Sequence, residues 1–132
     1  MAFELQMVVA TTLILLVLLV IQGGTVPLNQ GLIWGLGSRD APKEKSAFQG
    51  RAARTVSNHI EGMLLFVPLA LVIVAAEAST SLTALGAGLY VAGRLAYAPL
   101  YLLGVPYLRS AAWAVAVTGT LIIAYAAIIA AL

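Results

Sequence analysis

The sequence contains no cysteine, a single histidine and few charges. Only 9% of its 132 residues are charged, whereas an ordinary soluble domain carries roughly 25%. The lack of cysteine excludes disulfides and Cys-type metal sites, and one histidine with scattered carboxylates offers no metal ligand set. Seven lysines and arginines are too few for a surface that follows a phosphate backbone. The composition therefore excludes a soluble globular enzyme, a nucleic-acid binder and a disordered tail.

The sequence is instead rich in hydrophobic residues, which make up 62% of the chain. Residues 5–38 and 110–132 carry no charge, and each interval exceeds the roughly 20 apolar residues that a membrane-spanning helix needs. Two more spans fit between them if some charged residues lie inside the membrane. Polar, Gly and Pro residues at 35–50, 78–81 and 104–106 indicate the turns.

These intervals and turns predict one all-α domain over residues 1–132, an integral membrane four-helix bundle. The expected helices cover approximately 5–34, 50–77, 81–103 and 107–131. Four spans place both termini and the 78–81 turn on one side of the membrane, and the 35–50 loop on the other. Each predicted helix therefore runs antiparallel to the one before it.

The basic residues are concentrated on the side of the 35–50 loop. The positive-inside rule places that side in the cytoplasm, which predicts a multi-pass protein, of bacterial inner-membrane type, with its termini on the opposite side. Glu4 and Glu77 are expected to be solvated helix ends. The charge run 39–45 is expected to be a solvated loop, with contact to acidic membrane lipids as the alternative.

Polar residues also fall inside the predicted spans, where each charge costs about 2.5–3.5 kcal/mol on insertion scales. At about 100° per residue, four polar residues of the second helix fall within about 80° of arc. They are Arg51, Arg54, Asn58 and Glu61. A tighter stripe on the third helix consists of Tyr90, Arg94, Tyr97 and Tyr101, and the fourth helix opens with Arg109 and Ser110. The helix directions place both stripes in the cytoplasmic half of the bilayer.

One interpretation is that these groups only neutralise one another and hold the helices together. The four arginines at 51, 54, 94 and 109 face a single carboxylate, Glu61, which leaves an excess of +3. This excess favours an anionic ligand, because the planar guanidinium suits carboxylate or phosphate. Arg51 and Arg109 could instead extend to lipid headgroups. His59 lies away from the stripe, so we expect it to pack at a helix or subunit contact.

The ordered set of these polar motifs on four helices resembles the MAPEG family, the membrane-associated proteins in eicosanoid and glutathione metabolism. The motifs are Arg54-xxx-Asn58-xx-Glu61, Arg94-xx-Tyr97-xxx-Tyr101 and Arg109-Ser110. The resemblance covers nearly the whole chain. It implies a homotrimer of four-helix subunits, with glutathione bound between neighbouring subunits near the cytosolic face.

The resemblance also implies roles for single residues. Positions matching Arg54, Asn58 and Glu61 hold the carboxylate and amino ends of glutathione. The rest of the peptide is held by the positions matching Arg94, Tyr97 and Tyr101, and Arg51 adds positive charge beside them.

The expected catalytic residues are Arg109 and Ser110. The arginine that matches Arg109 lies beside the thiol and favours the thiolate, and Ser110 matches a serine that some members place near the same sulfur. An adjacent cation lowers the pKa of a thiol from about 8.5, and a drop of two units corresponds to about 2.7 kcal/mol.

Three functions follow, of which the first is favoured. It is a glutathione S-transferase-like attack of the bound thiol on a lipophilic small molecule drawn from the bilayer. The alternative is a non-catalytic scaffold of the same fold that binds lipids or fatty acids. A small proton-coupled four-span transporter is disfavoured, because it would be expected to carry an acid in the middle of its first helix and residues 5–38 have none.

Overall fold

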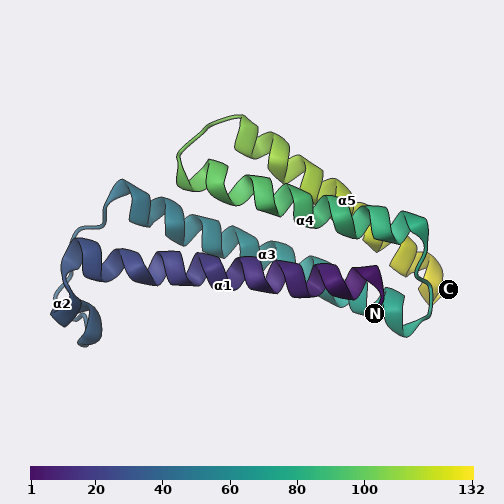
Figure 1. Ribbon diagram of the computed structural model, residues 1–132, viewed down its shortest axis with the longest axis horizontal. Helices are drawn as coiled ribbons and strands as arrows, with labels where there is room; N and C mark the ends of the chain where they lie inside the picture. Colours follow the sequence, from purple (N-terminus) through teal and green to yellow (C-terminus); the bar gives the residue numbers. More distant parts are fainter.

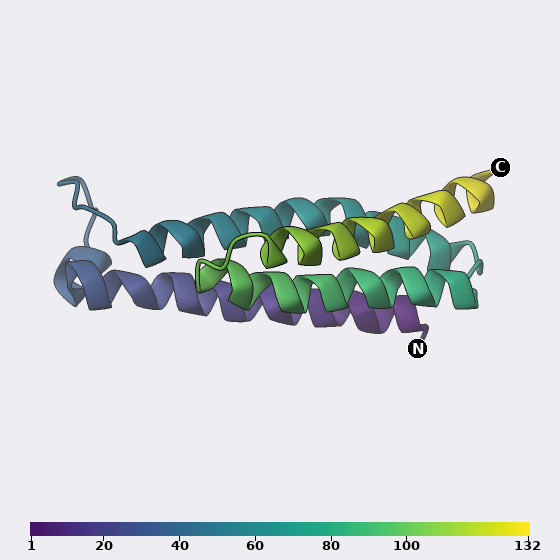
Figure 2. The ribbon, with the colours of Figure 1, turned by 90° about the horizontal axis from the view of Figure 1, so that it is seen from above.

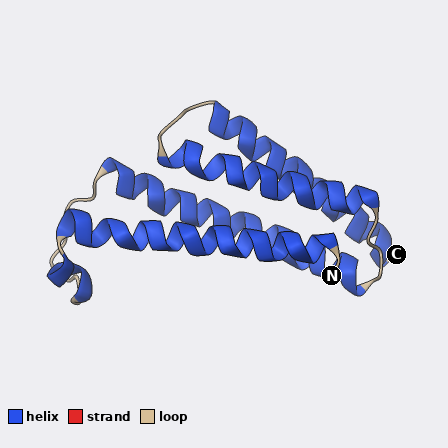
Figure 3. Cartoon of the chain, viewed as in Figure 1, coloured by secondary structure: helices blue, strands red, loops and turns tan.

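The structure, a computed structural model, describes residues 1–132 and contains four long helices and one short one. They are α1 (Phe3–Gln30), α2 (Leu32–Leu36), α3 (Ala47–Ala75), α4 (Ser81–Leu102) and α5 (Leu108–Ala131). Figures 1 and 2 show the long helices lying along the same axis, with both termini at one end and α2 at the other. All connections are loops (Figure 3). The all-α class is confirmed, as is the predicted placement of both termini at one end.

The first helix differs from the prediction. A continuous helix over 5–34 was expected, but α1 ends at Gln30 and a separate short helix follows. Gly31 separates them with φ of 91° and ψ of 150°, a backbone conformation that glycine adopts readily and that no α-helix continues. Asn29 and Gln30 before this glycine are polar, but the absence of charge over residues 5–38, on which the prediction rested, does not reveal a break.

Capping side chains fix where α3 and α4 begin. Ser46 Oγ accepts a hydrogen bond from the Gln49 N–H at 3.2 Å, and the Gln49 side chain accepts one from the Ser46 N–H at 3.0 Å. Such a capping box satisfies free N–H groups of the first turn, so α3 begins at Ala47, three residues earlier than predicted. Thr80 and Thr83 form the same motif before α4, where the sequence predicted a break.

Three helices, α1, α3 and α5, are long and apolar enough to cross a membrane. The 22 residues of α4 also have sufficient length, but α4 is not among the three. Arg94 and three tyrosines on this helix reduce its apolar content. The fourth span therefore stays a prediction.

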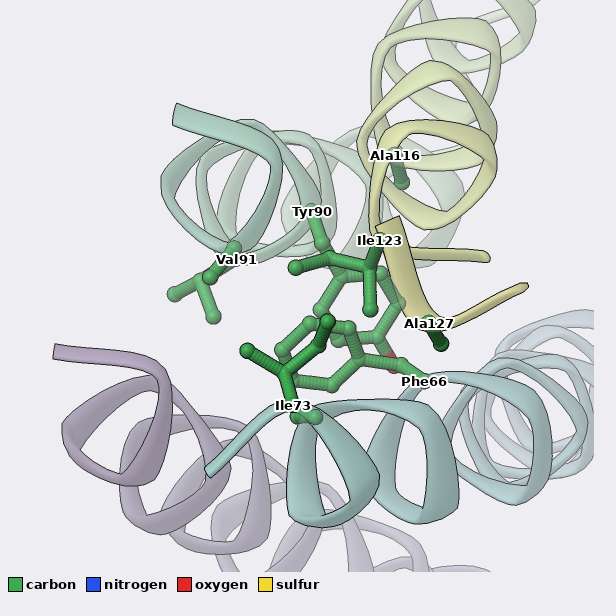
Figure 4. Close-up of a cluster of buried hydrophobic side chains, with 9 residues drawn as sticks. Phe66, Ile73, Tyr90, Val91, Ala116, Ile123 and Ala127 are labelled. Atoms are coloured by element: carbon green, nitrogen blue, oxygen red, sulfur yellow. The ribbon is translucent and has the colours of Figure 1, made fainter. Parts of the chain in front are cut away.

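The interior is formed by side chains from α3, α4 and α5 (Figure 4). Phe66 of α3 stacks on Tyr90 of α4 with ring centroids 4.0 Å apart and planes 13° from parallel. The helices α4 and α5 approach closely at Gly93, where a Cβ atom would lie only 2.8 Å from the Ala112 carbonyl oxygen. This close packing fixes the position of α4 relative to the first turns of α5.

Glu4 corrects a second prediction. It was expected to be a solvated helix end, but its side chain is only 1% exposed. Its carboxylate accepts hydrogen bonds from the Thr83 hydroxyl at 2.5 Å and the Ser79 hydroxyl at 3.2 Å. Hydroxyl groups replace water around the carboxylate, so Glu4 ties the start of α1 to the start of α4. Glu77 is exposed, as predicted.

His59 packs at a helix contact, as predicted. It is 2% exposed, and its Nε2 atom lies 2.9 Å from the Thr11 carbonyl oxygen and 3.1 Å from the Thr11 hydroxyl. The histidine therefore joins α3 to α1 within the interior of the bundle.

Candidate functional site

A cavity of about 680 Å³ opens where α3 begins, α4 ends and α5 begins. We call it the basic cavity. Its lining residues are Lys45, Ser46, Ala47, Gly50, Arg51, Arg54, Tyr101, Gly104, Pro106 and Arg109. Four of these side chains are cationic and none is acidic. Such a concentration of positive charge attracts an anion.

Tyr101 lies between two of the arginines. The Arg54 Nε–H donates a hydrogen bond of 2.9 Å to the Tyr101 hydroxyl, and the Arg109 guanidinium lies 4.5 Å from the centroid of the Tyr101 ring. The Tyr97 ring follows at 5.4 Å from that of Tyr101. This stacking orders the guanidinium of Arg109, while most of the donors on both arginines remain free for a ligand.

Arg51 is held by the end of α4. Its Nε–H donates a hydrogen bond of 2.9 Å to the Leu102 carbonyl oxygen, which belongs to the last turn of that helix. Carbonyl groups at a helix C-terminus carry partial negative charge and favour a cation there. Arg51 therefore both lines the basic cavity and fastens the start of α3 to the end of α4.

A tight turn leads from α4 back into α5. Gly104 has a φ of 73°, and Tyr107 has a φ of 62° and a ψ of −57°. The Leu108 N–H donates a hydrogen bond of 2.7 Å to the Pro106 carbonyl oxygen, so residues 106–108 form a γ-turn of the less common hand. This turn starts α5 next to the end of α4 and so brings Arg109 back onto Tyr101.

Arg94 lies deeper in the bundle and is only 4% exposed. Its Nη1 atom donates a hydrogen bond of 2.6 Å to the Asn58 amide oxygen, whereas its Nε atom is buried without a partner. The guanidinium packs against Gly62, where any Cβ atom would collide with it. The tyrosine rings of residues 90 and 97 flank it, with centroids 5.5 and 5.8 Å away.

A groove of about 260 Å³ between α3 and α5 leads to this arginine. We call it the Arg94 groove. Its lining residues are Asn58, Glu61, Gly62, Leu65, Arg94, Trp113, Val117, Thr120 and Leu121. Glu61 is exposed, and the partner of Arg94 is the neutral amide of Asn58 rather than this carboxylate. The bonds of Arg51 and Arg54 also go to neutral acceptors, so these arginines keep their positive charge available.

The structure distributes the predicted site residues over two neighbouring places. The basic cavity contains Arg51, Arg54, Tyr101 and Arg109, and the Arg94 groove contains Asn58, Glu61 and Arg94. Tyr97 is buried, with its ring close to both Arg94 and Tyr101. Ser110 is exposed and lines neither place.

The lining residues that sequence reasoning did not assign to a site include Lys45, Gly62 and Trp113. Helical spacing would have identified two of these residues. Gly62 lies four residues after Asn58, and Trp113 lies four residues after Arg109, so each follows a predicted residue on the same helix face. Lys45 precedes α3 in the loop, where no periodicity places a side chain.

One of the comparisons with known proteins gives a match. The model of the MAPEG family matches residues 7–129, a range that includes both the basic cavity and the Arg94 groove. No curated protein and no solved structure matches the chain. The family match, together with three helices long and apolar enough to cross a membrane, shows a membrane protein. The chain therefore belongs to the MAPEG family.

Proposed function

We propose that this protein is an integral membrane, glutathione S-transferase-like enzyme that binds an anionic thiol in the basic cavity. The observation that carries the proposal is a cavity of about 680 Å³ with four cationic side chains and no carboxylate. Glutathione matches this chemistry, because it has two carboxylates and one ammonium group and is a net anion at neutral pH. Family membership supports the same class of function.

The peptide would lie along the start of α3 and the end of α4. Arg51 and Arg54 offer guanidinium donors to its carboxylates, since most of their N–H groups are free in the cavity. Glu61, exposed two helical turns beyond Arg54, is the acidic group available for the ammonium end. Arg94, Tyr97 and Tyr101 then border the remainder of the peptide.

Arg109 is the residue proposed to act on the sulfur. It is ordered on the Tyr101 ring at the edge of the basic cavity, where it would stabilise the thiolate. The thiolate then forms a carbon–sulfur bond with a lipophilic electrophile, whose leaving group departs with the electron pair. The charge that Arg109 stabilises is carried away by the leaving group, so no metal is required for this step.

An apolar groove along the bundle is the proposed place for the electrophile. The groove, of about 350 Å³ between α1 and α4, is lined almost entirely by hydrophobic side chains, from Leu13 to Leu102. It shares no lining residue with the basic cavity. A lipophilic molecule dissolved in the bilayer would bind in this groove before it meets the thiolate.

A homotrimer and a cytoplasmic site are parts of the same proposal. Glu61 and Trp113 are exposed although they border the buried Arg94, and a neighbouring subunit would cover them. The basic loop lies at the end of the bundle that holds the basic cavity, and the positive-inside rule assigns this end to the cytoplasm.

One observation favours a non-catalytic scaffold that binds lipids as the second candidate. Ser110, the residue expected to lie near the sulfur, points away from both places. The apolar groove alone would suffice for a fatty acid. A transporter remains disfavoured, because the one acid of α1 is Glu4 in its first turn, where hydroxyl groups of α4 and the preceding loop hold it.

The Arg109→Ala substitution separates the two candidates. We expect glutathione conjugation of a model electrophile to fall about 25-fold at pH 7, because without the cation the thiol pKa returns from about 6.5 to about 8.5 and the thiolate fraction falls from about 0.8 to about 0.03. Glutathione-dependent thermal stabilisation should persist in this variant. Ser110→Ala is the matched control and should retain wild-type conjugation. Unchanged conjugation in Arg109→Ala would disprove the thiolate role, and a wild-type protein that conjugates nothing would favour the scaffold.

A further inference from the structure

A second cavity with basic walls lies where α1 meets the loop before α3. We call it the loop cavity; its volume is about 340 Å³. Its lining residues are Leu19, Gln22, Gly23, Thr25, Val26, Gln30, Trp34, Arg39, Lys43, Lys45, Gln49 and Ala53. Only Lys45 also lines the basic cavity. The loop cavity therefore needs an explanation separate from the thiol site.

Buried amide groups build the wall of the loop cavity. Gln30 and Gln49 are 8% and 6% exposed and exchange two hydrogen bonds of 2.7 Å. Gln30 also donates to the Glu44 carbonyl oxygen at 2.8 Å, and its own carbonyl oxygen accepts from Lys43 Nζ at 3.0 Å. These bonds fasten the loop to α1 and α3, so the cavity is preformed.

The charge inside the loop cavity is positive. Arg39, Lys43 and Lys45 line it, whereas the two acids of the same loop, Asp40 and Glu44, do not. The Asp40 carboxylate accepts its hydrogen bond from Ser38. Arg39 donates to the Gly35 carbonyl oxygen, at 2.9 Å from Nε and 2.8 Å from Nη2. Three cations thus border a small cavity without a carboxylate among them.

The short helix α2 adds an exposed apolar surface beside this cavity. Leu32, Ile33 and Leu36 are 61%, 90% and 78% exposed. Trp34, whose ring lies 5.8 Å from both Arg39 and Lys43, donates its indole N–H to the Ala41 carbonyl oxygen at 2.8 Å. Apolar side chains with tryptophan and cations next to them are typical of segments at the boundary of headgroups and acyl chains. Figures 1 and 2 show α2 at the extreme end of the bundle, where this boundary would be.

We propose that the loop cavity binds the phosphate headgroup of an acidic membrane phospholipid. Arg39, Lys43 and Lys45 supply the positive charge, and Trp34 and α2 place the cavity at headgroup depth. The acyl chains would extend past Leu19, which lines the cavity and is 45% exposed on α1. The proposal does not depend on the thiol chemistry.

The test compares lipids of equal chain length in detergent solutions of the full-length protein. Phosphatidylglycerol should raise the melting temperature and remain bound in native mass spectrometry, whereas phosphatidylcholine should do neither. The Arg39→Asn/Lys43→Gln double variant should bind phosphatidylglycerol about tenfold more weakly or worse, because each basic residue near an anionic headgroup contributes to affinity. Asparagine suits the left-handed conformation of residue 39, whose φ is 60°.

Two further variants make this test specific. Gln6→Glu/Ser81→Glu changes the net charge by the same −2 at the opposite end, on exposed residues, and should bind phosphatidylglycerol as the wild type does. The Arg39→Lys/Lys43→Arg variant keeps both positive charges and should also bind phosphatidylglycerol. It tests the proposal even if Arg39→Asn/Lys43→Gln fails to fold, because a loss of phosphatidylglycerol binding in the charge-preserving variant would contradict the proposal.

Four further outcomes would overturn the proposal. They are equal stabilisation by both lipids, equal loss of binding in the Gln6→Glu/Ser81→Glu control, and stabilisation by inorganic phosphate as large as that by the lipid. The fourth is a loss of glutathione binding in Arg39→Asn/Lys43→Gln with lipid binding intact, which would assign these cations to the thiol site instead.

Discussion

Charged side chains have different surroundings at the two ends of the bundle. At one end, the basic cavity gathers four cationic side chains without a carboxylate. At the other, Glu4 is a carboxylate without a cation, 1% exposed and held by hydroxyl groups of Ser79 and Thr83. Arg54 is exposed, and Arg51 and Arg109 are half-buried. The charge of Glu4 is buried and hydrogen-bonded, whereas the cationic side chains of the basic cavity are exposed or half-buried.

This difference gives Glu4 a structural role, whereas the arginines of the basic cavity are the residues that we propose to bind a ligand. Hydroxyl groups of the protein donate to both oxygens of the Glu4 carboxylate, which is buried, so the residue fastens two segments. Arg51 and Arg54 of the basic cavity use one N–H each for neutral acceptors and keep the others free. We therefore expect substitutions at the two ends to affect different measurements.

The largest effect is expected for Arg54→Gln. The substitution removes a guanidinium from the basic cavity and should weaken glutathione binding about tenfold to a hundredfold, as expected for loss of a charged hydrogen bond. The melting temperature without ligand should stay near that of the wild type, because Arg54 is exposed. Isothermal titration and thermal melting measure the two quantities. Arg54→Lys, which keeps the charge, should bind with intermediate affinity.

A second effect, on stability, is expected for Glu4→Ala. The protein should lose about 1–3 kcal/mol of stability, because two hydrogen bonds to a buried carboxylate disappear, while its glutathione affinity stays unchanged. Glu77→Ala is the matched control, since Glu77 is an exposed acid near the same end, and it should melt as the wild type does. A Glu4→Ala variant that melts normally but loses ligand binding would reverse the comparison of the two ends.

The smallest effect is expected for Gly62→Ala. A methyl group at residue 62 would collide with the Arg94 guanidinium, so the arginine must shift away from Asn58. We expect glutathione affinity to fall severalfold, and Asn58→Ala to have a similar effect through loss of the same hydrogen bond. Gly88→Ala on α4 is the control, because a Cβ atom there meets only ordinary contacts. Equal glutathione affinity in Gly62→Ala and Gly88→Ala would show that Arg94 does not contribute to the binding site.

Much of the site was predictable because helix direction and helical spacing determine it. Once three successive helices alternate in direction, the start of α3, the end of α4 and the start of α5 must meet. Arg54, Tyr101 and Arg109 then share a cavity, as the structure shows. Ser110 lines neither place, because a residue adjacent to Arg109 points about 100° away on the same helix, and its role near the sulfur, which the family resemblance implies, stays a prediction.

The remaining features depend on partners far away in the sequence. The burial of Glu4 requires hydroxyl groups 75 and 79 residues later, which no local pattern reveals. The break at Gly31 arises from the backbone conformation of a single residue within an uncharged stretch of the sequence. The loop cavity depends on the pairing of Gln30 with Gln49 across 19 residues, whereas residues 39–45 themselves are exposed, as predicted.

The melting temperature of the wild-type protein in detergent, with and without glutathione, tests the central claim most directly. A ligand that binds only the folded state stabilises it by an amount that grows with concentration over Kd. We predict a rise in melting temperature that depends on glutathione concentration and that is strongly reduced in Arg54→Gln but retained in Glu4→Ala. No rise in the wild type at millimolar glutathione, or an equal rise in Arg54→Gln, would contradict a glutathione site in the basic cavity.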